Sequence, residues 1–149
     1  VAVSPDSNIY TLQDLAGKNI AVQATTKPED IFLNQTDPDI PKINGLFSMQ
    51  NRELIYPMLS KGYVDAVAAH ETSILQYMSD YHVEYRILDK PLLTVELGVA
   101  FSLDDTSGLN EKLSDTLEEM QKDGTSEKII GKYLAHPSTY LEVENYEVK

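Results

Sequence analysis

The sequence predicts an α/β domain, with a mostly parallel sheet flanked by helices and further helices at its C-terminal end. Three observations predict this fold. Short apolar runs rich in β-branched residues alternate with helical segments through most of the chain, as expected of strands joined by crossover helices. The apolar period then lengthens to that of a long helix. The 149 residues are 42% hydrophobic and 24% charged, a balance typical of a chain that buries a core.

The first elements are a helical turn, a strand, a helix and a second strand. Residues 11–15 form the turn, because a threonine precedes it and a glycine follows it. Residues 19–23 (NIAVQ) are short and β-branched, which favours a strand. A threonine, a proline in the first turn and two acidic residues then start a helix over residues 26–35. Prolines and aspartates predict a loop at 37–41, before a strand at 45–49.

The later elements continue the alternation before the period changes. Further helices and strands are expected at 51–61 (helix), 64–69 (strand), 71–80 (helix), 84–88 (strand) and 96–101 (strand). Pro57 should kink or shorten the first of these helices. Leucines at helical spacing predict an amphipathic helix over residues 109–121, and a shorter helix over 125–134. The tail at 136–149 shows no clear periodicity.

Charge and composition exclude several classes of function. Twelve basic and 24 acidic residues give a formal net charge of −12, which repels nucleic acid and anionic membrane surfaces. The absence of cysteine excludes disulfides, thiolate nucleophiles and cysteine-ligated zinc. No apolar run reaches the length of a membrane span, and no signal peptide is visible. The chain opens without methionine on a strand-like run, which indicates a processed chain or a piece of a longer one.

Motifs for catalysis or metal binding are weak. His70 and Glu71 begin like a zinc-protease helix, but Ile74 stands where the second histidine is needed. Asp37 and Asp39 hint at a calcium loop that neighbouring prolines interrupt. No glycine-rich phosphate loop and no nucleophile elbow is present. No cofactor and no metal site are expected.

Two segments qualify as ligand contacts because each follows a predicted strand and opens a helix. Thr25, Thr26 and Lys27 offer backbone N–H groups and hydroxyls that can hold an anion, although helix capping explains them equally well. His70 and Glu71 follow the strand at 64–69, although an ordinary surface loop also explains them. In open α/β sheets, ligands bind at the carboxyl ends of strands, where both segments are expected.

Four segments in order resemble the polar amino-acid class, family 3, of bacterial extracytoplasmic solute-binding proteins. DLAGKNIAVQ at 14–23 resembles a signature of this family, and LSKGYVDAV at 59–67 resembles its segment ending in DAV. LGVAF at 97–101, followed by a long helix, and DGT with KIIGKYL at 123–134 match its C-terminal end. The resemblance extends over about residues 1–135.

The resemblance implies a periplasmic-binding-protein type II fold, in which two α/β lobes joined by two crossover strands close on a small polar ligand. Since such proteins usually exceed 200 residues, this chain corresponds to only part of one. The implied organisation is a second lobe at 1–95, with residues 1–4 as the connecting strand. A crossover strand and helices at 96–135 would return to the first lobe, and a tail would follow at 136–149.

The resemblance also implies roles for individual residues. Thr25 and Thr26 match a Gly-Thr turn that binds the ligand's carboxylate, with Thr25 in place of glycine. Gln23 matches a position that reads the ligand's side chain. His70 stands where the family has the aspartate that pairs with the ligand's ammonium group, and Glu71 beside it can supply that negative charge.

The function implied is non-catalytic binding of an amino acid or related polar solute outside the cytoplasm. The implied setting is an ABC transporter's binding protein or the ectodomain of a membrane sensor, with the transporter or attached signalling domains as partners. One alternative is a dehydratase-like enzyme of the same fold, with Glu71 as its acid. Another is a structural domain that forms a homodimer or strand-exchanged dimer through the amphipathic helix at 109–121.

Overall fold

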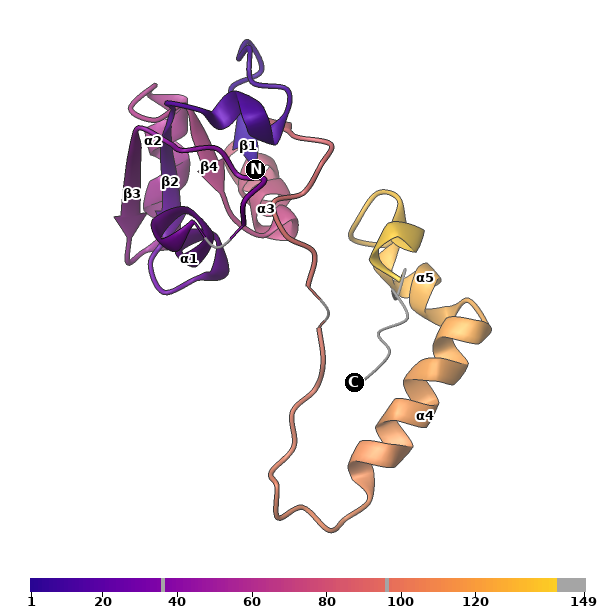
Figure 1. Cartoon of the computed structure of the whole chain (residues 1–149). Coiled ribbons are helices and arrows are strands. Elements are labelled where there is room, and N and C mark those ends of the chain that lie inside the picture. The colour runs from indigo at the N-terminus through magenta and orange to yellow at the C-terminus, as the bar shows by residue number, and fades with distance from the viewer. Residues whose placement is uncertain (36, 96, 142–149) are drawn as a thin grey trace. The chain divides into compact units, whose positions relative to one another are not determined.

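The computed structural model describes residues 1–35, 37–95 and 97–141. The chain divides into two compact units, Val1–Thr94 and Val95–Lys149. Figure 1 shows that the first unit contains the sheet and that the second contains the long helix. Each unit is therefore described by itself.

Five strands in the first unit form one sheet in the order β3-β2-β4-β1-β5. Their bounds are Ala2–Val3 (β1), Asn19–Gln23 (β2), Gly45–Met49 (β3), Ala66–Ala68 (β4) and Arg86–Ile87 (β5). β2 pairs in parallel with both β3 and β4. β1 pairs antiparallel with both β4 and β5, so β5 runs in the same direction as β4. The α/β class and the shared direction of four strands agree with the prediction.

The prediction was incomplete for β1 and wrong for residues 97–101. Residues 1–4 were expected only as a connection between lobes, whereas β1 enters the sheet between β4 and β5 and makes it mixed. Residues 97–101 form no strand, and residue 96 lies outside the described residues. A strand requires a neighbour for its main-chain hydrogen bonds, and the described part of the second unit contains no other strand.

The helices of the first unit begin and end close to the predicted residues. They are η1 (Leu12–Leu15), α1 (Lys27–Asn34), η2 (Arg52–Leu54), α2 (Ile55–Ser60) and α3 (Glu71–Tyr81). The predicted helix at 51–61 is split into η2 and α2. Asn51 caps the start of η2, because its side-chain oxygen accepts a hydrogen bond from the Glu53 N–H at 2.9 Å. Pro57 lies in the first turn of α2, where its missing N–H costs no helical hydrogen bond.

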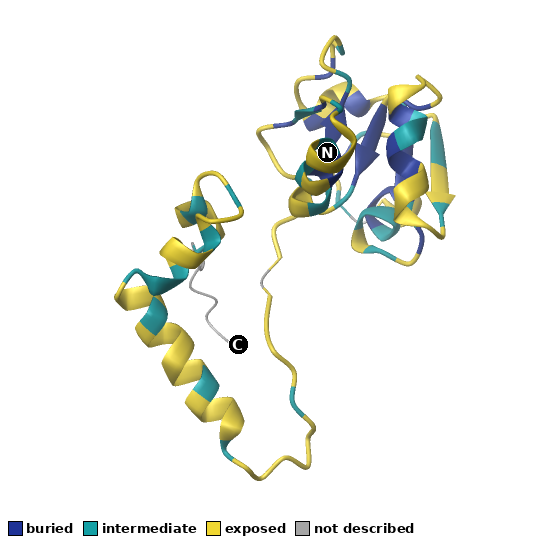
Figure 2. Ribbon diagram, turned by 180° about the vertical axis from the view of Figure 1, so that it is seen from behind, coloured by how far each residue is buried: buried dark blue, intermediate teal, exposed yellow. Residues whose placement is uncertain are grey.

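Alternating side chains of the sheet form two hydrophobic clusters, one on each face. Ile20 and Val22 belong to the cluster that contains Ile31 and Phe32 of α1. Ala21 belongs to the other cluster, which contains residues of α2 and α3. This alternation follows from the period of two residues in a strand. Figure 2 shows the buried residues inside the first unit and the exposed ones on its outer helix faces and on the edge strand β3.

The described part of the second unit consists of one long and two short helices and has no buried core. They are α4 (Leu109–Lys122), α5 (Thr125–Ile130) and η3 (Pro137–Tyr140), and none contains a buried residue. α5 ends at Ile130 and not at Leu134 as predicted, because the chain turns from Gly131 onward. The part of the predicted tail at 142–149 lies outside the described residues. Every buried hydrophobic residue of the described chain lies between Val1 and Leu88.

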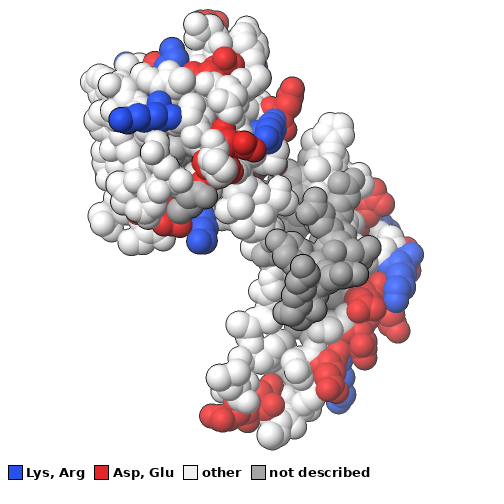
Figure 3. All heavy atoms as spheres, in the orientation of Figure 1, with Lys and Arg blue, Asp and Glu red and all other residues white. Residues whose placement is uncertain are grey.

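Charged and apolar groups line the surface of the second unit. Figure 3 shows carboxylates gathered along α4. The same helix exposes Leu109 and Leu117, and the segment before it exposes Leu97 and Leu103 at 91% and 104%. Within the described residues, no helix has the length and apolar character needed to cross a membrane.

Candidate functional site

The candidate site lies at the edge of the sheet where β2 and β4 end. The two strands are parallel neighbours, with Val22 opposite Ala68, so the residues that follow each strand emerge side by side. From β2 the chain passes through α1 to β3 on one side, and from β4 it passes through α3 to β5 on the other. Adjacent strands whose connections leave in opposite directions form a topological switch point, where open α/β sheets bind ligands.

The turn after β2 has an unusual backbone. Thr25 has φ 61°, a left-handed conformation that costs a β-branched residue about 1–2 kcal/mol. The Ala24 N–H donates to the Met49 carbonyl oxygen at 2.9 Å, which fixes the turn against β3. The Thr26 hydroxyl donates to the Gln23 carbonyl oxygen at 2.6 Å. The resemblance places glycine at position 25, and the positive φ explains why glycine suits this turn.

The carboxylate of Glu29 accepts a hydrogen bond from the main-chain N–H of Thr25 in this turn. The Thr25 N–H donates to Glu29 Oε2 at 2.6 Å, and the Ser48 hydroxyl donates to Glu29 Oε1. The hydrogen bonds from Ser48 and then Thr25 hold the pKa of Glu29 below its ordinary value. Glu29 was not among the site residues expected from the sequence. The spacing Thr26-x-x-Glu29, which resembles a capping box, was the available signal.

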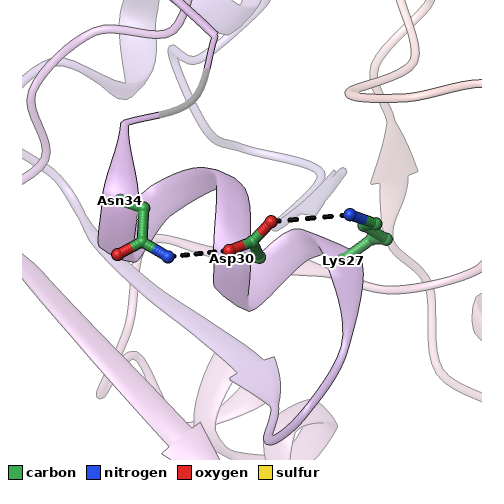
Figure 4. Close-up of polar contacts among 3 residues, drawn as sticks. All are labelled: Lys27, Asp30 and Asn34. Atoms are coloured by element: carbon green, nitrogen blue, oxygen red, sulfur yellow. Dashed lines mark hydrogen bonds and ion pairs between the residues drawn. The ribbon is translucent and has the colours of Figure 1, made fainter.

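A shallow hollow of about 370 Å³ lies beside this turn. Seven residues line it: Thr25, Thr26, Lys27, Glu29, Asp30, Leu33 and Asn34. Figure 4 shows a polar row along α1, in which Asp30 lies between Lys27 and Asn34. The Lys27 ammonium lies 3.6 Å from Asp30 Oδ2, and the Asn34 amide donates to Asp30 Oδ1 at 2.7 Å. The hollow therefore presents two carboxylates and one ammonium group.

His70 and Glu71 are exposed at the start of α3. The His70 carbonyl oxygen accepts hydrogen bonds from the N–H and the hydroxyl of Ser73, both at 3.0 Å. It also accepts the Ile74 N–H at 3.1 Å. The main chain of His70 thus begins the helix, while its imidazole makes no capping hydrogen bond. Glu71 is the first residue of α3, where its negative charge interacts favourably with the positive N-terminal end of the helix dipole.

The structure brings together only part of the predicted set. Thr25, Thr26 and Lys27 line the same hollow. Gln23 is half-buried at the end of β2, and His70 and Glu71 share the edge of the sheet without lining the hollow. No group of three or more possible metal ligands forms within the part of the chain that the structure describes.

Comparisons with curated proteins find relatives that extend over most of this chain. The histidine-binding periplasmic protein of Escherichia coli is 33% identical over 142 residues, covering 89% of this chain and 53% of that protein. A putative ABC transporter arginine-binding protein 2 of Escherichia coli is 31% identical over 129 residues, covering 83% and 51%. A probable amino-acid-binding protein, YxeM of Bacillus subtilis, is 27% identical over 135 residues, covering 89% and 50%. The chain thus spans about half the length of the curated relatives it matches.

Solved structures share the fold over a similar extent. An ancestral arginine-binding protein bound to glutamine is 27% identical, with a TM-score of 0.63 over 89% of this chain and 57% of that one. The substrate-binding domain 2 of GlnP from Lactococcus lactis, in its open conformation, is 24% identical. It matches with a TM-score of 0.68 over 89% of this chain and 56% of its own. No protein-family model matches the chain.

Proposed function

Because this chain is a relative of the bacterial solute-binding proteins of family 3, the polar amino-acid class, we propose that it is part of an extracytoplasmic amino-acid-binding protein. The protein binds its ligand without chemical conversion and delivers it to an ABC transporter. The observation that carries the proposal is the polar switch point where β2 and β4 end side by side. The names of the relatives, a periplasmic protein and a transporter component among them, support the location and the partner.

The chain supplies one wall of the binding cleft. Since it spans about half the length of its relatives, residues 1–95 are proposed as the second lobe of a two-lobed binder. Residues 96–135 are proposed to return to the first lobe, followed by the tail at 136–149. The division of the chain between Thr94 and Val95 is compatible with this organisation.

Six residues are proposed to face the ligand from this wall. Thr25, Thr26 and Lys27 contribute the turn beside the hollow, and Gln23 contributes a half-buried amide at the end of β2. The carboxylate of Glu71 pairs with the ligand's ammonium group in the role that aspartate has in the family, and His70 lies next to it. Both are exposed before any ligand binds.

Calorimetry on the protein with both lobes tests this function. L-histidine, L-arginine and L-glutamine are titrated into the protein and into its Glu71→Gln and Glu53→Gln variants. We expect one of these amino acids to bind and Glu71→Gln to weaken it at least about tenfold, as loss of a charge-assisted hydrogen bond does. Glu53→Gln removes the same charge after β3 and should change little. Absence of binding by all three amino acids would contradict the proposed function.

The exposed apolar side chains of the second unit favour a second, structural role for the isolated chain. Leu97 and Leu103 are almost fully exposed, and Leu109 and Leu117 are about half exposed. Exposed apolar surface of this kind favours association. We therefore propose that the 149-residue chain forms a homodimer or exchanges this unit with a second copy. Light scattering coupled to gel filtration checks the mass, and a monomer at high concentration would contradict dimerisation.

A further inference from the structure

Asn44 and Gly45 are the one asparagine–glycine pair in the sequence. Gly45 is the first residue of β3, which is an edge strand of the sheet (Figure 1). Each of the other six asparagines precedes a residue with a side chain, whose Cβ hinders the approach of its main-chain nitrogen to the asparagine amide. The Asn44 side chain is exposed, so water and hydroxide reach it. Attack by the following nitrogen is therefore least hindered at this pair.

The main-chain nitrogen of Gly45 is held only loosely. The Asn44 N–H donates to the Lys18 carbonyl oxygen at 2.8 Å, and the Gly45 N–H shares that acceptor at 3.4 Å. The longer distance lies outside the range of an ordinary N–H···O hydrogen bond. A proton held in this way is removed more easily, and its removal makes the Gly45 nitrogen a nucleophile.

The packing around Gly45 favours glycine at this position. A Cβ added to Gly45 would lie 2.9 Å from Oδ1 of Asn19, closer than ordinary van der Waals contact. The side-chain amide of Asn44 donates to the same Oδ1 at 2.8 Å, which holds that oxygen against the glycine. Asn19 is also the partner of Gly45 in the register of β2 and β3. The pairing of these strands thus retains the asparagine–glycine pair.

We propose that Asn44 is a site of spontaneous covalent modification, at which the folded chain converts asparagine to aspartate or isoaspartate. The deprotonated Gly45 nitrogen attacks Cγ of Asn44, the Cγ–Nδ2 bond breaks, and ammonia leaves with the proton that Gly45 lost. The product is a cyclic succinimide, and water adds to either of its carbonyl carbons to open the ring. Water is the only co-reactant, and the inference is independent of the proposed function.

The modification should loosen the start of β3. Either product has a carboxylate in place of the Asn44 amide, so the donor to Asn19 Oδ1 is lost and acceptors face each other. Asp65 Oδ2 already accepts the Asn19 N–H at 2.8 Å, so the new negative charge joins another beside Asn19. Isoaspartate also adds a main-chain carbon before Gly45, which disturbs the register of β3 against β2.

Incubation of the 149-residue chain in mildly alkaline buffer, folded or unfolded in urea, tests the site. Peptide mass spectrometry locates deamidation, and labelling by protein isoaspartyl methyltransferase detects isoaspartate. In the folded chain, Asn44 should react faster than every other asparagine and within about tenfold of its rate in urea. Asn44→Gln keeps an amide on a longer side chain and should abolish the reaction at position 44. Reaction of Asn44 in urea but not in the folded chain would overturn the proposal, as would faster reaction of another asparagine.

Two aspartate variants test the effect on β3. Asn44→Asp reproduces the charge of the product and should lower the urea midpoint of the 149-residue chain. Asn8→Asp makes the same charge change at another exposed asparagine of the first unit and should lower the midpoint less. Equal midpoints for the two variants would contradict the loosening of β3.

Discussion

The hydroxyl of Tyr85 donates a hydrogen bond to the main-chain carbonyl oxygen of Tyr56, 3.0 Å away. The same hydroxyl oxygen lies 2.6 Å from the hydroxyl of Ser60. These contacts attach the residue before β5 to α2, on the face of the sheet where the Tyr56 and Tyr77 rings stack with centroids 4.3 Å apart.

Removing the Tyr85 hydroxyl should destabilise the first unit, and removing the Tyr56 hydroxyl should not. Tyr85→Phe leaves buried polar partners unsatisfied, so we expect the free energy of unfolding to fall by about 1–2 kcal/mol. The Tyr56 hydroxyl is buried without a hydrogen-bond partner among the described residues. Tyr56→Phe is the matched variant and should be neutral or slightly stabilising. Urea unfolding measures both, and an equal loss for the two variants would contradict the assignment.

Stability should decrease at alkaline pH in a way that depends on Tyr85. Burial raises the pKa of the Tyr85 hydroxyl, while the hydrogen bond with Ser60 acts in the opposite direction. Because the folded pKa exceeds the unfolded value of about 10, the contribution of Tyr85 is complete below that pH. It is lost as the pH rises through the folded pKa. Urea midpoints measured across this range should fall less steeply for Tyr85→Phe than for the wild type.

The control for the alkaline transition is Tyr63, whose side chain is 65% exposed. Tyr63→Phe removes a hydroxyl from an exposed side chain and should leave the slope of stability against pH unchanged. A slope that changes equally in both variants would show that the buried hydroxyl is not responsible.

Glycine at position 25 should relieve backbone strain. Thr25→Gly removes the cost of a left-handed β-branched residue, about 1–2 kcal/mol, and adds the unfolded-state entropy of glycine, about 0.5–1 kcal/mol. We expect a free energy of unfolding that is unchanged or raised by up to about 1 kcal/mol. Thr26 has φ −113°, so Thr26→Gly has no such strain to relieve and should be destabilising. Thermal unfolding of the two variants decides the point, and the reverse order would contradict it.

The first 94 residues should fold alone. They contain every buried hydrophobic residue of the described chain and both hydrophobic clusters. We expect the 1–94 fragment to unfold cooperatively in urea, with a midpoint close to that of the whole chain. The 95–149 fragment should show little stable helix by circular dichroism, because single helices of this length are marginal in water. An unfolded 1–94 fragment would show that the second unit contributes to the core.

Sequence reasoning located elements best where local signals and burial agreed. Residues 19–23 were predicted as a strand and form β2, because their apolar alternation fits both faces of the sheet. The helix after Thr26 began where its proline and acidic residues indicated. The strand predicted at residues 97–101 does not form. An apolar run becomes a strand only where another strand can pair with it.

The site was only partly predictable, because the positions of its polar groups depend on hydrogen bonds between residues that are distant in sequence. The placement of Thr25 and His70 at one edge followed from the order of strands and helices. The occupation of the Thr25 N–H by Glu29 depends on Ser48, which is 19 residues away in sequence and reaches Glu29 only through the pairing of β2 with β3. A pattern read along one segment does not contain that contact.

Because successive side chains of β2 point to opposite faces of the sheet, the first unit has two hydrophobic cores separated by the main chain of the sheet. Val22 and Val67 are both fully buried, but they belong to different clusters on opposite faces of the sheet. A cavity opened at one side cannot merge with a cavity opened at the other, because the main chain of the sheet lies between them. A loss of packing at Val22 therefore opens space beside α1, whereas a loss at Val67 opens space beside α2 and α3.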